Sequence, residues 1–182
     1  MTQGGKQPSH QYRMIDVGGK NVTRRRAIAT GRIRLGPVAY PMVRDRSLPK
    51  GDPLVLAETA GILAAKKTAD LIPLCHPLGL DHVVVAFQLD PVSESVVGFC
   101  QAATSARTGV EMEALAGVQT ALLTIWDLAK QVEAGLAIDN VRLLLKEGGK
   151  SGRWTHPDGL PTLPADFDEF QSIEPQRDTA HE

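Results

Sequence analysis

Residues 82–104, HVVVAFQLDPVSESVVGFCQAAT, decide the fold of this chain. The run 82–89 is rich in β-branched residues and predicts a strand, and residues 95–104 predict a second one. Between the two runs, Asp90-Pro91-Val92-Ser93 has the residue types of a tight turn. The stretch therefore predicts two neighbouring strands of an antiparallel sheet.

A strand and a helix are expected before this pair. Residues 27–35 mix small, β-branched and basic side chains and predict a strand that ends at Gly36-Pro37. Asp52 suits the N-cap of a helix, and Pro53 suits its first position, where the missing N–H costs nothing. Apolar residues then follow helical spacing until Ile72-Pro73, where we expect the helix to end.

A second helix and a last strand are expected after the pair. Residues 110–134 have the longest helical pattern, and Gly135 is in the right place to end it. The apolar stripe of this segment consists of Val110, Leu115, Val118, Leu122, Ile125, Ala129 and Val132. Residues 141–145 predict the last strand.

The predicted order of elements is β-α-β-β-α-β. This order indicates an α+β fold, a ferredoxin-like sandwich in which two helices cover one face of an antiparallel four-stranded sheet. The same fold serves enzymes, RNA-binding modules and metabolite sensors, so it does not identify the function.

The 182 residues suit one domain, which we place at residues 13–154. Residues 1–12 and the acidic, proline-rich residues 155–182 are expected to be flexible extensions. No apolar run reaches the roughly 18 residues of a membrane span, and the N-terminus lacks the apolar stretch of a signal peptide. We therefore expect a cytoplasmic protein without a membrane partner. Cys75 and Cys100 are then expected to be reduced, and their spacing fits no zinc or iron–sulfur motif.

Charge is distributed unevenly along the chain. The net charge is −1, but residues 155–182 hold seven acids and one base, which leaves 14 acids and 19 bases, or +5, on residues 1–154. A basic body favours an anionic ligand, although surplus bases also serve simply to solvate a surface. Aromatic residues make up only 4%, and no basic run is interleaved with stacking side chains, so nucleic acid is not an expected partner.

Three clusters of polar residues stand out against this pattern. The first is the loop Leu74-Cys75-His76, which Pro73 and Pro77 stiffen, so that His76 is either aimed at a ligand or simply a histidine on a surface turn. In the second, Thr108 and Glu111 have the spacing of a capping box, whereas Glu113 has no such role and is the better candidate for ligand binding.

The third cluster is Asp127 with Lys130, three residues apart on the second helix. The pair is either a surface ion pair or an acid–base couple. Glu113 and Asp127 are 14 residues apart, which is about 21 Å along a helix axis, and they point within about 40° of each other. One small substrate could hardly reach both on one chain, so a site that contains both needs neighbouring subunits.

Taken together, these segments resemble the cyclic pyranopterin monophosphate synthase family over roughly residues 14–153. The matching stretches in this chain are Met14-Ile15-Asp16-Val17 with Lys20, Lys50-Gly51-Asp52, Ala64-Ala65-Lys66-Lys67-Thr68, residues 70–78 (DLIPLCHPL), residues 108–115 (TGVEMEAL), Asp127-Leu128-Ala129-Lys130, residues 141–146 (VRLLLK) and residues 148–152 (GGKSG). Arg107 departs from the lysine expected before Thr108-Gly109, and the tail after Trp154 has no clear counterpart.

The resemblance implies a lyase of molybdenum cofactor biosynthesis. Its substrate would be 3′,8-cyclo-7,8-dihydro-GTP, and its products cyclic pyranopterin monophosphate and pyrophosphate. It also implies a homo-hexamer, a trimer of dimers, with active sites at subunit interfaces. The catalytic positions fall on Asp127 and Lys130, and the substrate-binding positions on Leu74, Cys75, His76, Met112, Glu113, Lys50, Lys66 and Lys146.

The expected chemistry suits these residue types. Opening and reclosing a purine-derived ring moves protons, which lysine, aspartate and histidine can do without a metal or redox cofactor. Clustered lysines can stabilise the departing pyrophosphate. We expect no resident cofactor, and Mg²⁺ would enter only with the triphosphate. The alternative is a non-catalytic ferredoxin-like nucleotide-binding or RNA-binding module, which predicts aromatic residues on the sheet face.

Overall fold

The computed structural model describes residues 12–150 and 152–167. The elements are β1 (Thr23–Arg34), α1 (Gly36–Arg44), α2 (Pro53–Lys66), α3 (Thr68–Leu71), β2 (His82–Asp90), β3 (Ser95–Ala106), α4 (Glu111–Ala129), β4 (Ala137–Glu147), β5 (Trp154–Thr155) and the 3-10 turn η1 (Ala165–Phe167). Most of residues 1–12 and all of 168–182 lie outside the described residues, so their predicted flexibility stays a prediction.

The strands form one sheet in the order β2-β3-β1-β4-β5. Every neighbouring pair is antiparallel, and β1 pairs with β3 along its whole length. The first four strands have the predicted ferredoxin-like arrangement, which is confirmed. The sheet nevertheless has five strands rather than four, because Trp154 and Thr155 pair with Lys146 and Leu145 at the free edge of β4.

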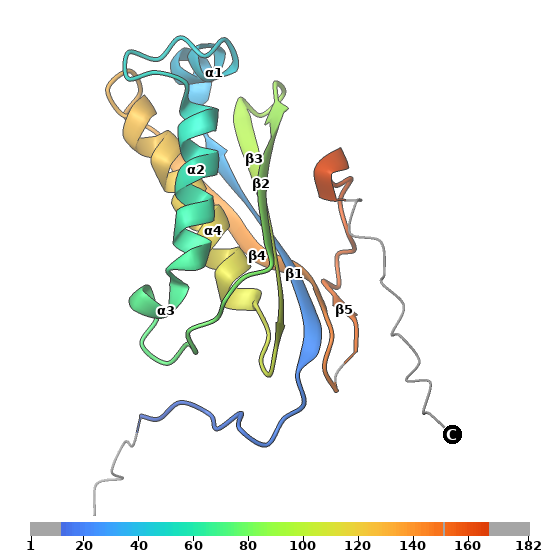
Figure 1. The fold of residues 1–182 in the computed structure, drawn as a ribbon. Helices are drawn as coiled ribbons and strands as arrows, with labels where there is room; N and C mark the ends of the chain where they lie inside the picture. Colours follow the sequence, from blue (N-terminus) through green and yellow to red (C-terminus); the bar gives the residue numbers. More distant parts are fainter. Residues whose placement is uncertain (1–11, 151, 168–182) are drawn as a thin grey trace, which may run out of the picture.

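Helices α2 and α4 cover one face of the sheet (Figure 1). Asp52 caps α2 as predicted, with its Oδ1 accepting from the backbone N–H of Leu54 at 3.0 Å and of Val55 at 3.3 Å. The two helices pack closely because glycines face each other: a Cβ at Gly61 would lie 2.9 Å from the carbonyl oxygen of Gly117. This contact sets the position of α2 along α4.

Several predicted boundaries were wrong. Strand β1 begins at Thr23 rather than at residue 27, and β4 spans Ala137–Glu147 rather than residues 141–145. Residues after Gly36 form α1 rather than a simple break, because Pro37 is tolerated in a first turn and Tyr40 and Val43 are buried against the core. The first predicted helix is interrupted at Lys67 and continues as the single turn α3. Helix α4 ends at Ala129, five residues before the predicted end, so Lys130 is its C-cap.

The other face of the sheet is covered by residues that were expected to be flexible. Phe167 is fully buried and packs with Ile28, Phe99, Leu144 and Leu145. Residues 155–182 were expected to be a flexible extension, yet the part that the structure describes, 155–167, carries the buried Phe167. The sequence pattern did not indicate this packing because a single aromatic residue among prolines and acids has no periodicity.

Candidate functional site

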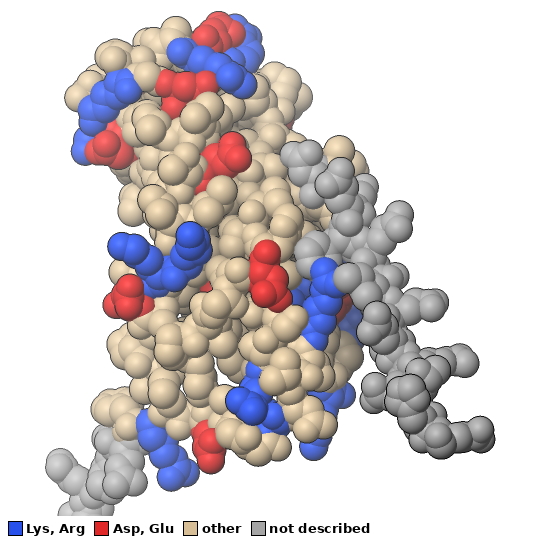
Figure 2. Space-filling model, in the orientation of Figure 1, with Lys and Arg blue, Asp and Glu red and all other residues tan. Residues whose placement is uncertain are grey.

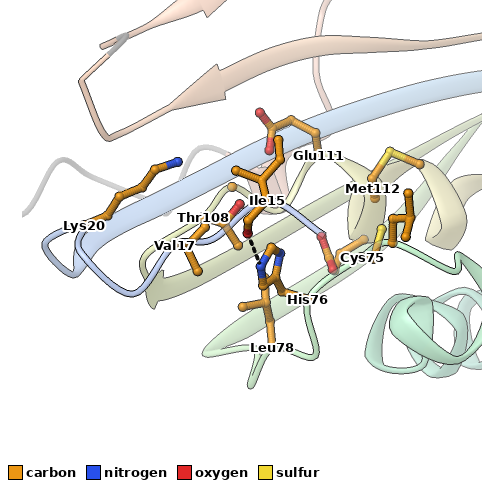
Figure 3. Close-up of a pocket in the computed structure, with 12 residues that line it drawn as sticks. Ile15, Val17, Lys20, Cys75, His76, Leu78, Thr108, Glu111 and Met112 are labelled. Carbon is orange, nitrogen blue, oxygen red and sulfur yellow. Dashed lines mark hydrogen bonds between the residues drawn. The ribbon is translucent and has the colours of Figure 1, made fainter. Parts of the chain in front are cut away.

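A cavity of about 380 Å³ lies at the N-terminal end of α4 (Figure 3). Four segments build its wall: the chain before β1, the loop after α3, the loop after β3 and the first turn of α4. Its lining includes five predicted substrate-binding residues, Leu74, Cys75, His76, Met112 and Glu113, together with Ile15, Val17, Lys20, Leu78, Thr108, Gly109 and Glu111. The structure thus brings the first two sequence clusters together in one hollow.

His76 is held by the segment before β1. Its Nε2 lies 2.9 Å from the carbonyl oxygen of Ile15, as the dashed line in Figure 3 shows. A carbonyl oxygen only accepts, so Nε2 carries a proton and donates. This bond orients the imidazole ring on the cavity wall.

Glu113 and Cys75 are biased toward their neutral forms. Glu113 is only 5% exposed, and burial raises the pKa of its carboxyl, with the charge of Glu111 acting in the same direction. Burial also raises the pKa of the Cys75 thiol, and the nearby Glu113 carboxylate raises it further. This wall of the cavity suits a neutral polar ring better than a phosphate.

Two further cavities adjoin the first one and are basic. One of about 560 Å³ shares Lys20 with it and is also lined by Arg25 and Lys150. The other, of about 160 Å³, shares Gly109 and Glu111 and is lined by Arg25, Arg26, Lys146, Glu147 and Gly148. Lys146 Nζ lies 3.3 Å from Glu111 Oε1. Positive side chains thus continue from the edge of the first cavity along the start of β1.

The side chain of Arg25 packs against the two glycines that follow β4. Gly148 and Gly149 have φ of +98° and +72°, which side chains rarely adopt. A Cβ at Gly149 would lie 2.1 Å from Arg25 Nη1, so the guanidinium packs directly on the glycine backbone. Arg25 also donates to the carbonyl oxygens of Gly148 and Arg107, both at 3.5 Å.

The predicted acid–base couple lies at the opposite end of α4. Asp127 Oδ1 accepts from Lys130 Nζ, 2.6 Å away, and Oδ2 accepts from Lys50 Nζ, 3.1 Å away. The two ammonium groups, Lys130 first, hold the pKa of Asp127 below its usual range. Asp127 and Lys130 are each about half exposed.

The three other predicted lysines lie in three different places. Lys50 belongs with Asp127, and Lys146 lies at the basic end, on the wall of the 160 Å³ cavity. Lys66 is exposed in the last turn of α2, outside the wall of the 380 Å³ cavity. The predicted capping box does not form: α4 begins at Glu111 with Val110 as N-cap, so Thr108 lies too far upstream.

The sequence interpretation missed several site residues. Lys20 was part of a matching stretch but was not assigned to the site, and Arg25, Arg26 and Lys150 were not assigned either. The signal that could have found them is the run Arg24-Arg25-Arg26 at the start of β1, together with the paired glycines that follow β4, the strand that pairs with β1 in the sheet. Among residues 12–150 and 152–167, no three His, Cys, Asp or Glu side chains are grouped so as to hold a metal ion.

The chain was then compared with known proteins. The family model described as the MoaC family matches residues 14–149. Two curated proteins, one from each of two strains of Chloroflexus aurantiacus, are 49% identical over 145 residues, which is 80% of this chain and 89% of each relative. Both are called cyclic pyranopterin monophosphate synthase. A match over this share of the chain shows the family, and the protein belongs to the MoaC family.

Proposed function

We propose that this protein acts as a cyclic pyranopterin monophosphate synthase, a lyase of molybdenum cofactor biosynthesis. Its substrate is 3′,8-cyclo-7,8-dihydro-GTP, and its products are cyclic pyranopterin monophosphate and pyrophosphate. The observation that carries the proposal is the pairing of two kinds of cavity at the N-terminal end of α4. A wall that contains Glu113 and Cys75, whose pKa values burial raises, adjoins cavities lined by Lys20, Arg25 and Lys146, which matches a purine-derived ring that carries a triphosphate.

The two kinds of cavity would act on different parts of the substrate. Glu113, whose pKa burial raises, and His76 are placed on the cavity wall to exchange hydrogen bonds with heteroatoms of the ring. Closure of the cyclic phosphate forms a bond from a sugar hydroxyl to the α-phosphorus and breaks the bond to the β-phosphate. The pyrophosphate that leaves carries negative charge, which Lys146 and Arg25 would stabilise.

Asp127 and Lys130 would supply the proton transfers. Asp127 is bonded to the ammonium groups of Lys130 and Lys50, and a lysine that gives a proton to the substrate can take one back in a later step. Since α4 is continuous from Glu111 to Ala129, the couple lies about 21 Å from Glu113 along the axis. One chain therefore holds the two functions too far apart for a single substrate.

We propose that a second copy of the chain completes the site, in a homo-hexamer built as a trimer of dimers. Exposed apolar side chains on the helical face support self-association: Val55, Leu56 and Leu63 on α2, and Leu123 on α4. In Figure 2, uncharged atoms make up most of the surface over α2. A contact on this face would bring the ends of two α4 helices from different chains toward one another.

We also propose a cytoplasmic protein that needs no resident cofactor, with Mg²⁺ entering only on the triphosphate. Lysine, aspartate and histidine suffice for the proton transfers that the reaction needs. In the described part of the chain, the helices are too short or too polar to cross a bilayer.

A non-catalytic RNA-binding module has less support. Such a module stacks bases on exposed aromatic residues of the sheet. Here Phe99 is 1% exposed beneath Phe167, and Phe87 packs against the core under the helices. The face that would bind RNA is already occupied by residues of the same chain.

The direct test is incubation of the purified protein with 3′,8-cyclo-7,8-dihydro-GTP and measurement of released pyrophosphate and of the cyclic monophosphate product. GTP itself is the matched control, because it carries the same triphosphate without the cyclised ring. Product from the cyclised compound alone supports the proposal. Binding of both compounds without pyrophosphate release would instead indicate a non-catalytic nucleotide-binding protein.

A further inference from the structure

The C-terminal segment 154–167 lies beyond residues 14–149, which match the family, yet it is anchored on the domain. Phe167 is fully buried, with its ring edge-to-face against Phe99 at 6.2 Å between centroids. Gln88 Nε2 donates to the carbonyl oxygen of Thr162 at 3.1 Å, and the backbone N–H of His156 donates to Leu144 at 2.8 Å. These contacts run the length of the segment and hold it across the sheet.

The end of the segment contacts Arg26. This guanidinium is largely buried, and each of its nitrogens has an acceptor: Nε donates to Gln101 Oε1 at 2.9 Å, Nη1 to Glu147 Oε2 at 3.5 Å and Nη2 to the carbonyl oxygen of Phe167 at 3.0 Å. A buried guanidinium is costly unless its donors are satisfied. The segment supplies one of these acceptors, so the position of Arg26 depends on Phe167.

Arg26 and Glu147 also line the basic cavity of about 160 Å³, beside Lys146 and Glu111. Arg153, next to the segment, forms an ion pair with Glu147, with Nη1 3.3 Å from Oε1. The residues around the segment thus hold both members of an ion pair in the cavity wall. Movement of Arg26 or Glu147 would change the charge that faces an anion next to Lys146.

We propose that residues 154–167 form a strap that positions Arg26 and Glu147 in the wall of the basic cavity, so that binding of the pyrophosphate group depends on this segment. Phe167 is the positioning residue, and it acts through its backbone carbonyl while its ring fixes that carbonyl in place. The proposal rests on the proposed function for the identity of the anion.

The test measures binding of inorganic pyrophosphate by calorimetry to the full chain and its variants. Phe167→Ala should weaken binding about tenfold, the usual effect of disturbing a hydrogen bond to a charged group. Phe167→Leu should restore most of the affinity, because leucine refills the apolar pocket. Leu160→Ala is the matched control, since Leu160 lies in the same segment but is partly exposed and outside the buried cluster, and it should bind as the wild type does.

A double-mutant cycle distinguishes positioning from general destabilisation. In an Arg26→Gln background, Phe167→Ala should weaken binding no further, because the group that it positions is gone. If Phe167→Ala does not fold, Gln88→Leu loosens the strap at Thr162 without opening the core and should weaken binding in the same direction. Additive losses in the cycle, or unchanged pyrophosphate affinity in both strap variants, would overturn the proposal.

The two proposals fail in different ways. A wild-type protein that binds pyrophosphate in a strap-dependent manner but releases none from 3′,8-cyclo-7,8-dihydro-GTP would contradict the proposed reaction and leave the strap supported. Normal turnover and normal pyrophosphate affinity after Phe167→Ala would contradict the strap and leave the reaction supported.

Discussion

At the N-terminal end of α4, four chain segments surround a hollow in which burial raises the pKa of Glu113. At the C-terminal end of the same helix, Asp127, Lys50 and Lys130 lie on open surface, and the pKa of Asp127 is lowered instead. The first end can enclose a ligand, and burial raises the pKa of its carboxyl. The second end carries three charged groups whose side chains are 38–54% exposed.

This contrast shows that neither end is a complete active site. Binding needs a dry wall, whereas proton transfer needs charged groups that gain and lose protons near neutral pH. A single helix of 19 residues cannot bring its own two ends together. Within one chain the fold therefore separates ligand binding from proton transfer. Assembly of several chains is expected to bring the two together in one site.

The largest expected effect comes from removing charge at the C-terminal end. Asp127→Asn and Lys130→Ala should each lower kcat for pyrophosphate release by between about 100-fold and 10,000-fold, the usual contribution of a general acid or base. Because both side chains are about half exposed, the Tm of each variant should equal that of the wild type. Activity near the wild-type level in either variant would show that this end is only a surface ion pair.

The second prediction tests whether the two ends act across chains. Asp127→Asn and His76→Ala chains, each inactive alone, are refolded together. If each site takes one residue from each chain, half of randomly paired dimers are hybrids with one intact site, so about a quarter of wild-type turnover should return. Hybrids confirmed by mass spectrometry that stay as inactive as their parents would place both residues on one chain.

The third prediction concerns the close contact between α2 and α4, where Gly61 faces Gly117. Gly61→Ala adds a Cβ that would lie 2.9 Å from the backbone oxygen of Gly117 and 3.0 Å from Val85 Cγ2. Overpacking of this kind should lower the free energy of unfolding by about 1–3 kcal/mol, measured by urea denaturation. Gly79→Ala is the control, because a Cβ there meets nothing within 4 Å and should change stability little.

The smallest expected effect is on how the stability of the protein depends on pH, through the buried carboxyl of Glu113. Because the folded pKa of Glu113 is raised, the folded state binds its proton more tightly than the unfolded state. Stability from this group is fully present below the unfolded pKa and is lost as pH rises through the folded pKa. Glu113→Gln should therefore raise Tm by a few degrees at pH 7 relative to the wild type, and by less at pH 4. An equal change at both pH values would show that burial of the charge is not the cause.

The sequence predicted the fold well where periodicity was long. The strand pair 82–104 and the cap at Asp52 appear as expected, because alternation and capping are local properties. Helix α1 was missed since Gly36-Pro37 suits both a break and a helix start. Phe167 was missed because its partners, Phe99 and Leu144, are distant in sequence.

The candidate site was predicted where its residues are close in sequence and missed where they meet only after folding. Cys75, His76 and Glu113 lie on one cavity, and Asp127 bonds Lys130, as motif and helical spacing suggested. That Lys50 reaches Asp127 could not be derived from spacing, since the two are 77 positions apart and the chain between them must first fold into the α2–α4 pair. The basic wall around Arg25 was missed because it depends on two strands that meet only in the sheet.

Gly148 and Gly149 restrict which amino-acid substitutions this protein tolerates. A Cβ at Gly148 would lie 2.1 Å from the carbonyl oxygen of Arg24, and one at Gly149 would overlap the Arg25 guanidinium, while both residues have backbone angles that other amino acids rarely adopt. Every amino-acid replacement at Gly148 must therefore displace the backbone at the start of β1, and every replacement at Gly149 must displace the Arg25 side chain. Random mutagenesis of the gene would find defective variants at two residues that carry no functional group at all.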